Sequence, residues 1–201
     1  MTGNWLPGLL VVFGSLAQSG VQVTDTVEGK ISFQGMPATE AVVYLEHGTS
    51  ALVASADTVV LDQRGLRFLP GTLAVSPGTT VVFLNNDDIQ HNVFSPGEVV
   101  GSGDPFDLGT YSRGEMRIHT FPDLGVHTIL CNVHPEMLAY VVSVPTEYRT
   151  VTDSDGQFSI TDVPPGTYRL HVWHPQSSPV DQEIRVESDL RPLNITLEPE
   201  E

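Results

Sequence analysis

Basic residues are scarce in this chain. Lys and Arg number 9 against 25 Asp and Glu, so the formal net charge is −16. Such acidity argues against nucleic acid and anionic membrane surfaces as partners. The negative electrostatic field of the protein would attract a basic protein partner. An acidic surface also keeps an exported protein soluble without any partner. Charge alone leaves both interpretations open.

Long apolar runs and amphipathic helix patterns are also missing, with one exception at the N-terminus. Residues 6–13 are apolar, and Ser15-Leu16-Ala17 follows as a cleavage site. We interpret residues 1–17 as a secretory signal peptide, since the run is too short for a membrane span, although the usual basic residues are absent. A buried first strand and an uncleaved anchor are the alternatives. We therefore expect a periplasmic or secreted protein with no stable membrane insertion after signal removal.

Cysteine occurs once, as Cys131. Small exported domains usually pair their cysteines, and a single thiol cannot form an intrachain disulfide. Cys131 is therefore either a buried, inert side chain or a ligand that a metal ion occupies.

Turn residues, in contrast, are abundant: 18 Gly and 15 Pro separate short runs rich in Val and Thr. This texture predicts an all-β protein made of two antiparallel sandwiches with Greek-key connections. Residues 85–116 are expected to be mostly loop, and Asp155-Gly156 predicts a hairpin turn between strands at 149–152 and 157–160. The other strands are expected at 29–33, 41–45, 72–75, 79–84, 117–121, 127–130, 139–144, 167–173, 182–186 and 193–197.

The side chains with the clearest chemistry gather in one short segment, CNVHPEM, which places Cys131, His134 and Met137 three residues apart. Thiolate, imidazole and thioether suit copper better than calcium or magnesium, which prefer oxygen ligands. Two His, one Cys and a weak axial Met form the blue-copper pattern. A catalytic Cys-His pair is the competing interpretation, but Met137 completes a ligand set and so favours the metal.

That pattern needs a second histidine from elsewhere in the chain. We expect it to be His91, which follows the strand at 79–84 after a short loop. In a sandwich this loop and the one after residue 130 can meet at the same end. His127 lies about 13 Å from Cys131 along a strand and fits the core better.

Two segments, GTTVVFLNNDDIQHNVFS and FPDLGVHTILCNVHPEMLAYVVSV, together resemble a cupredoxin over about residues 59–146. The C-x₂-H-x₂-M loop is similar to the short ligand loop of amicyanins, C-T-P-H-P-F-M. The resemblance implies a Greek-key β-sandwich that carries single electrons on one type 1 copper. The ligands that it implies are His91, Cys131, His134 and the axial Met137.

Two residues are expected to tune this site from behind the ligands. The backbone N–H of Asn92 should donate a hydrogen bond to the Cys131 sulfur and stabilise the thiolate. Val133 stands where the amicyanin loop has proline, so a second N–H is available. We expect the Val133 N–H to bond the sulfur as well and to raise the potential.

The segments on either side resemble a carboxypeptidase regulatory-like, transthyretin-like β-sandwich. VEGKISFQGMPATEAVVYLEHG matches its first strands, and TVTDSDGQFSITDVPPGTYRLHVWHP matches a later part. We expect residues 26–50 and 147–199 to form this smaller, discontinuous sandwich around a cupredoxin domain at 51–146; a tandem arrangement is the alternative. The combination is similar to exported copper proteins of the methylamine-utilisation type.

The leading interpretation is an exported blue-copper electron carrier, not an enzyme, that serves a redox protein partner such as a c-type cytochrome. One alternative is periplasmic copper binding and delivery, and another is a surface interaction protein with a structural copper site. A copper oxidase would need further copper sites, and the chain offers no extra cluster of histidines for them.

Overall fold

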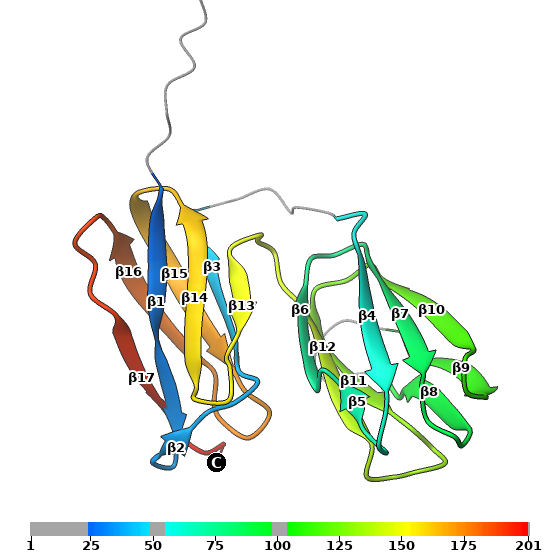
Figure 1. The fold of residues 1–201 in the computed structure, drawn as a ribbon. Coiled ribbons are helices and arrows are strands. Elements are labelled where there is room, and N and C mark those ends of the chain that lie inside the picture. Colours follow the sequence, from blue (N-terminus) through cyan, green and yellow to red (C-terminus); the bar gives the residue numbers. More distant parts are fainter. Residues whose placement is uncertain (1–23, 49–54, 98–103, 201) are drawn as a thin grey trace, which may run out of the picture.

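The computed structural model of the chain describes residues 24–48, 55–97 and 104–200. The elements in these ranges are strands, arranged as two β-sandwiches side by side (Figure 1). The predicted signal peptide, residues 1–17, lies outside the described residues. Within the described ranges, no helix has the length and apolar character needed to cross a membrane.

The flanking sandwich combines the first strands of the described chain with the last ones. In one sheet β1 pairs antiparallel with β14 and with the short β2, and parallel with β17; the other sheet has the order β13-β3-β15-β16. Its strands are β1 (Asp25–Phe33), β2 (Met36–Pro37), β3 (Val42–Glu46), β13 (Arg149–Val151), β14 (Gln157–Val163), β15 (Gly166–Trp173), β16 (Val180–Val186) and β17 (Leu193–Leu197).

The central sandwich is made from the strands in between. Its sheets have the orders β10-β7-β4-β5 and β6-β12-β11-β8-β9. The strands are β4 (Thr58–Gln63), β5 (Phe68–Leu69), β6 (Thr72–Val75), β7 (Thr79–Asn85), β8 (His91–Ser95), β9 (Phe106–Tyr111), β10 (Met116–Phe121), β11 (Gly125–Leu130) and β12 (Leu138–Ser143).

Each sandwich buries its own core through the two-residue period of its strands. Burial alternates along β7, where Val81 and Phe83 face inward, and along β15, where Leu170 and Val172 do so. The inward faces form two separate apolar clusters, one in each sandwich. The prediction of an all-β protein with two sandwiches is therefore confirmed. The prediction that both are antiparallel is wrong, because β1 pairs parallel with β17, β4 with β7, and β6 with β12.

Four strands of the central sandwich were not predicted. β8 and β9 lie inside residues 85–116, which we expected to be mostly loop, and β4 and β5 lie between residues 58 and 69, where we expected no strand. β9 is an edge strand whose residues are largely exposed, and Gly109 interrupts it with φ +72°. The alternation of apolar and polar residues in β9 is therefore weak. Its strand conformation is stabilised by antiparallel pairing with β8.

The predicted hairpin around Asp155-Gly156 is wrong, although the turn itself forms. Gly156 has φ +72°, and the Gly156 N–H donates to the carbonyl of Asp153. The strands on either side belong to different sheets, since β13 pairs with β3 and β14 pairs with β1. The turn therefore carries the chain from one layer of the sandwich to the other.

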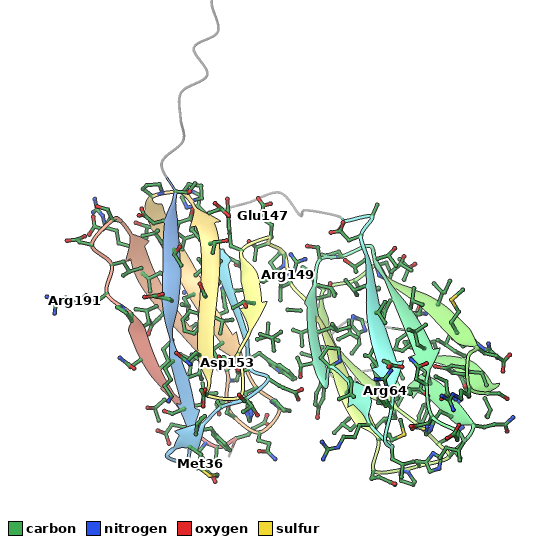
Figure 2. The ribbon with its side chains drawn as sticks, in the orientation of Figure 1. Met36, Arg64, Glu147, Arg149, Asp153 and Arg191 are labelled. Carbon is green, nitrogen blue, oxygen red and sulfur yellow. The ribbon has the colours of Figure 1, made fainter. Side chains whose placement is uncertain are left out.

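The two sandwiches meet in a small apolar junction. Val42 of the flanking sandwich packs with Val142 and Val144, and Trp173 packs edge-on against Tyr140. Polar contacts supplement this junction: the Arg149 side chain, labelled between β13 and β6 in Figure 2, donates from Nε to the carbonyl of Ala74 at 3.1 Å. The Gly71 N–H donates to the carboxylate of Glu40 at 3.0 Å.

Candidate metal centre

One end of the central sandwich brings three metal-ligating side chains together. His91 is the first residue of β8, Cys131 directly follows β11, and His134 lies in the loop between β11 and β12. β8 and β11 are neighbours that pair at Leu130 and Phe94, so this pairing places the two chain segments side by side. The ligating atoms of His91, Cys131 and His134 all lie within 4.8 Å of one another.

The triangle formed by these atoms has the size that a metal ion requires. His91 Nδ1 and His134 Nδ1 are 3.0 Å apart, and Cys131 Sγ lies 3.9 Å from the first and 4.0 Å from the second. The point equidistant from the three atoms is about 2.1 Å from each, close to the about 2.0–2.3 Å at which imidazole nitrogen and thiolate sulfur bind a borderline metal. The described residues contain no other such group of His, Cys, Asp and Glu.

Met137 follows His134 by three residues and lies in the core of the sandwich. Its side chain is buried in the same apolar cluster as Cys131. The Met137 N–H donates to the carbonyl of His134 at 3.0 Å, which closes the ligand loop into a tight turn. A thioether held in this way is suited to serve as a weak axial ligand to copper.

The environment of the sulfur contains one of the two expected backbone donors. The Asn92 N–H donates to Cys131 Sγ at 3.4 Å, and the Asn92 side chain is held by Asp107 at 2.7 Å. The expected hydrogen bond from the Val133 N–H to the sulfur stays a prediction: among the described residues, Asn92 supplies the backbone donor to the sulfur. The Asn132 N–H donates to the Asn92 side chain, and the Val133 side chain is exposed.

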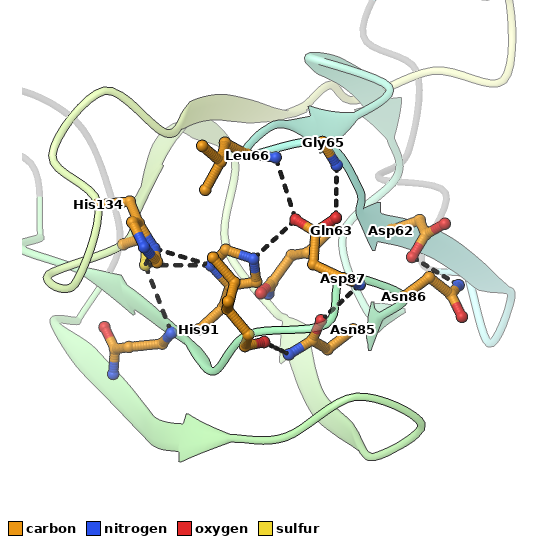
Figure 3. Close-up of polar contacts among 12 residues, drawn as sticks. Asp62, Gln63, Gly65, Leu66, Asn85, Asn86, Asp87, His91 and His134 are labelled. Atoms are coloured by element: carbon orange, nitrogen blue, oxygen red, sulfur yellow. Dashed lines mark hydrogen bonds and ion pairs between the residues drawn. The ribbon is translucent and has the colours of Figure 1, made fainter.

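The His91 ring is held on its far side by a carboxylate that the sequence analysis missed. His91 is fully buried, and its Nε2 lies 2.8 Å from Asp87 Oδ2 (Figure 3). With the proton on Nε2, the Nδ1 lone pair is directed toward Cys131 and His134. The position of Asp87, four residues before His91 in a loop, is the only signal for this role in the sequence.

Asp87 is itself held by backbone donors. The N–H groups of Gly65 and Leu66 donate to its two oxygens at 2.6 and 3.0 Å. Burial by itself would raise the pKa of this carboxyl, but the bonds from Leu66, Gly65 and His91 outweigh it and lower the pKa below its usual range. Asp87 is therefore a charged acceptor between the 64–67 turn and the site.

The opposite histidine is in a different environment. His134 is only partly buried, and its neighbours in the ligand loop are exposed. The Arg67–Leu69 side of the central sandwich and the Glu136–Leu138 side of the ligand loop line a common cavity of about 260 Å³. Exposed apolar side chains at this end of the sandwich are Leu66, Ile89, Val133 and Leu138, which we call the apolar rim.

Comparison with known families divides the chain into two parts. The family described as "Copper binding proteins, plastocyanin/azurin family" matches residues 55–144. The family described as "Carboxypeptidase regulatory-like domain" matches residues 138–198, so the two matches overlap in β12. Both families are those that the sequence segments resemble.

Three individual proteins illustrate what this chain is similar to. Plastocyanin from Ulva arasakii is 28% identical over 78 residues, which cover 36% of this chain and 80% of that protein. Amicyanin from Paracoccus versutus is 25% identical over 50% of this chain and 98% of its own, with a TM-score of 0.40. A Cu-containing nitrite reductase from Thermus scotoductus SA-01 is 26% identical over 44% of this chain, with a TM-score of 0.41; the match spans 23% of that enzyme.

The family match and the cluster of two His, one Cys and one Met agree on the cofactor, which is a single type 1 copper. Residues 55–144 are thus a cupredoxin domain of the copper-binding plastocyanin/azurin family, and the chain carries a carboxypeptidase regulatory-like domain in addition.

Proposed function

We propose that this protein is an exported single-electron carrier rather than an enzyme. The observation that carries the proposal is the triangle of His91, Cys131 and His134, which matches copper dimensions and has one buried and one partly buried histidine. His91, Cys131 and His134 would hold the copper, with Met137 as the axial ligand. The bound copper would supply the exchange between Cu(II) and Cu(I).

The chain's own contribution is a site that changes little when the charge changes. Strands β8, β11 and β12 anchor every ligand, and the Asn92 N–H stabilises negative charge on the Cys131 sulfur. His91 is held from behind by Asp87, so its ring has little freedom to turn. A rigid ligand set of this kind favours fast electron exchange, because few atoms have to move.

We further propose that electrons enter and leave through the partly buried edge of His134. The apolar rim surrounds this end of the sandwich and suits a short-lived contact with a protein partner. The net charge of −16 favours a basic partner, and a c-type cytochrome with a basic surface would satisfy both features.

For the domain arrangement we propose that residues 51–146 are inserted into a sandwich formed by 26–50 and 147–199. The pairing of β1 with β14 and β17 supports this division, because the strands come from opposite sides of the cupredoxin domain. Residues 1–17 would act as the export signal. The flanking sandwich then serves as a scaffold or binding module for the cupredoxin domain.

The test is visible absorption and EPR of the purified protein after Cu(II) is added, beside a Cys131→Ser variant. We expect an intense blue thiolate-to-copper band and narrow hyperfine splitting in the wild type, and neither in the variant. Reversible voltammetry should then show one electron per copper. A colourless protein that binds only Cu(I) would overturn the electron-carrier proposal and favour copper delivery.

A further inference from the structure

We propose that Asp87 is a positioning residue that holds the His91 ligand and the 64–67 turn as one unit. The inference rests on the proposed copper site and deepens it. It assigns the orientation of His91, and the location of Leu66 in the apolar rim, to a single carboxylate. Asp87 does not touch the ligating atoms of the site, so it acts through His91.

The His91 ring is held in place at one of its two nitrogens. Its Nε2–H has Asp87 Oδ2 at 2.8 Å, and the side chain of His91 is fully buried, so water does not compete for this donor. An imidazole that donates to a carboxylate is a stronger electron donor at its other nitrogen. Asp87 therefore sets which nitrogen of His91 faces Cys131 and how strongly that nitrogen binds a metal.

The turn between β4 and β5 has an unfavourable backbone conformation. Gly65 and Leu66 have φ +65° and +60°, and the Arg64 N–H donates to the carbonyl of Arg67 at 3.0 Å. A left-handed conformation is costly for a leucine and persists only where other contacts impose it. The two hydrogen bonds that the Gly65 and Leu66 N–H groups donate to Asp87 are such contacts.

Asp87 is itself held by its sequence neighbour Asn85. The Asp87 N–H donates to the Asn85 side chain at 2.9 Å, and Asn85 Nδ2 donates to the carbonyls of Ile89 and Tyr111. The neighbouring Asn86 binds the Asp62 carboxylate at 2.8 Å and connects the loop to β4 (Figure 3). The loop from β7 to His91 is thus bound to the sandwich by contacts within the protein itself.

These contacts use both oxygens of the carboxylate, which predicts what an amide would lose. Oδ2 accepts from His91 and Leu66, while Oδ1 accepts from Gly65. In Asp87→Asn the single amide oxygen can keep the His91 and Leu66 bonds, but the amide N–H₂ then faces the Gly65 N–H. The variant retains the shape of the site, loses one turn contact and loses the negative charge behind the ligand.

The experiment compares Asp87→Asn with Asp87→Glu and with Asp88→Asn in the full chain. Asp88 is the matched control, because it is exposed, forms an ion pair with Arg113 and does not contact His91. For Asp87→Asn we expect a higher reduction potential and a copper affinity about 10- to 100-fold lower, measured by chelator competition. Asp87→Glu should recover part of both, and Asp88→Asn should match the wild type.

A second readout uses the apoprotein, so that it does not depend on the copper chemistry. Amide hydrogen exchange at Gly65 and Leu66 should be faster in Asp87→Asn than in Asp88→Asn. Equal potentials, affinities and exchange rates in the two variants, with a blue wild type, would overturn the role of Asp87 alone. A wild type that is not blue would instead overturn the proposed function, while the exchange data would still report on Asp87.

If Asp87→Asn fails to fold, NMR of the wild type loaded with Cu(I) decides the question. We expect His91 to show a protonated Nε2 whose proton is strongly downfield and protected from exchange with water. A His91 ring whose Nε2 proton exchanges rapidly would contradict the proposed hydrogen bond to Asp87.

Discussion

The two sandwiches of this chain have cores of the same kind, but within the part of the chain that the structure describes only the central one contains a set of converging ligands. The core of the flanking sandwich is an apolar cluster that includes Ile31, Leu45 and Leu170. The core of the central sandwich is equally apolar along its length, yet one end adds buried His91, Asn92 and the thiol of Cys131. The apolar layers make the fold, and the polar end makes the site.

The turns at the sandwich ends explain the difference further. In the flanking sandwich, Asp153 accepts hydrogen bonds from the N–H groups of Asp155 and Gln157, at 2.9 and 2.8 Å. The Asp153 carboxylate therefore stabilises its own turn. In the central sandwich Asp87 accepts from a different turn and from His91, so the same residue type connects two segments there. Asp87 contributes to the metal site because its hydrogen-bond donors lie outside its own turn, whereas those of Asp153 lie within its own turn.

The largest effect should come from removing a buried histidine from the central sandwich. Removing one from the flanking sandwich serves as the comparison. His91→Ala removes a nitrogen from the metal triangle, so we expect the blue absorption band to disappear. His174→Ala changes a histidine that packs against Phe33 in the flanking sandwich and should leave the band intact. Absorption and EPR of both variants check this. Retention of the band in His91→Ala would contradict the ligand set.

Next in size are cavity-forming changes in the two cores. Leu61 and Leu170 are both fully buried, one in each sandwich, and replacement of either with Ala should cost about 2–5 kcal/mol of unfolding free energy. Leu61→Ala should also speed copper release, because β4 supports the end of the sandwich that carries the site. Leu170→Ala should leave copper release unchanged. Denaturant unfolding, followed by far-UV circular dichroism and by the blue band, separates the two cases.

The junction gives an intermediate effect. Trp173 is partly buried and packs at 5.1 Å from the ring of Tyr140, so Trp173→Ala should cost about 2 kcal/mol. We expect the wild type to unfold in one cooperative transition and the variant to show two transitions, with the copper spectrum unchanged before the first. Calorimetry of the copper-loaded protein tests this, and Tyr44→Phe, which keeps the apolar contact, is the control. One shared transition in the variant would show that the domains stay coupled without the Trp173 side chain.

Much of this architecture could be predicted because it depends on patterns that are local in the sequence. The turn chemistry and the Val-rich runs predicted most strands, and the spacing of Cys131, His134 and Met137 predicted the ligand loop. β9 was missed because an exposed edge strand has no strong alternation, and its order comes from pairing with β8.

Asp87 and Val133 show where the sequence alone is insufficient. The role of Asp87 depends on N–H groups more than twenty residues earlier in the chain, and no local pattern reports such a contact. The Val133 N–H was available in the sequence, but its direction depends on how the ligand loop turns between His134 and Met137. Hydrogen bonds between segments that are distant in the sequence are thus the feature that could not be predicted without the structure.

Acid should destabilise both sandwiches by the same means. Burial lowers the pKa of His174 in the flanking sandwich, and burial together with the nearby His127 lowers the pKa of His119 in the central one, both from an ordinary value of 6.5. Below about pH 6.5 these histidines bind protons more readily in the unfolded chain than in the folded chain. The unfolding free energy should therefore fall as the pH drops from about 7 to 5. His174→Gln should reduce this pH dependence in denaturant titrations. An unchanged slope would mean that His174 does not contribute.

The smallest effect is expected at Val133. Its N–H makes no hydrogen bond to Cys131 Sγ among the described residues, since Asn92 supplies the backbone donor, and its side chain is exposed. Val133→Pro removes that N–H and should therefore leave the reduction potential close to that of the wild type and of Val133→Ala. A clear fall in potential for the proline variant alone, with its EPR spectrum intact, would mean that this N–H bonds the thiolate in the copper-loaded protein. In that case the sulfur would have two backbone donors, and copper binding would itself reorient the ligand loop.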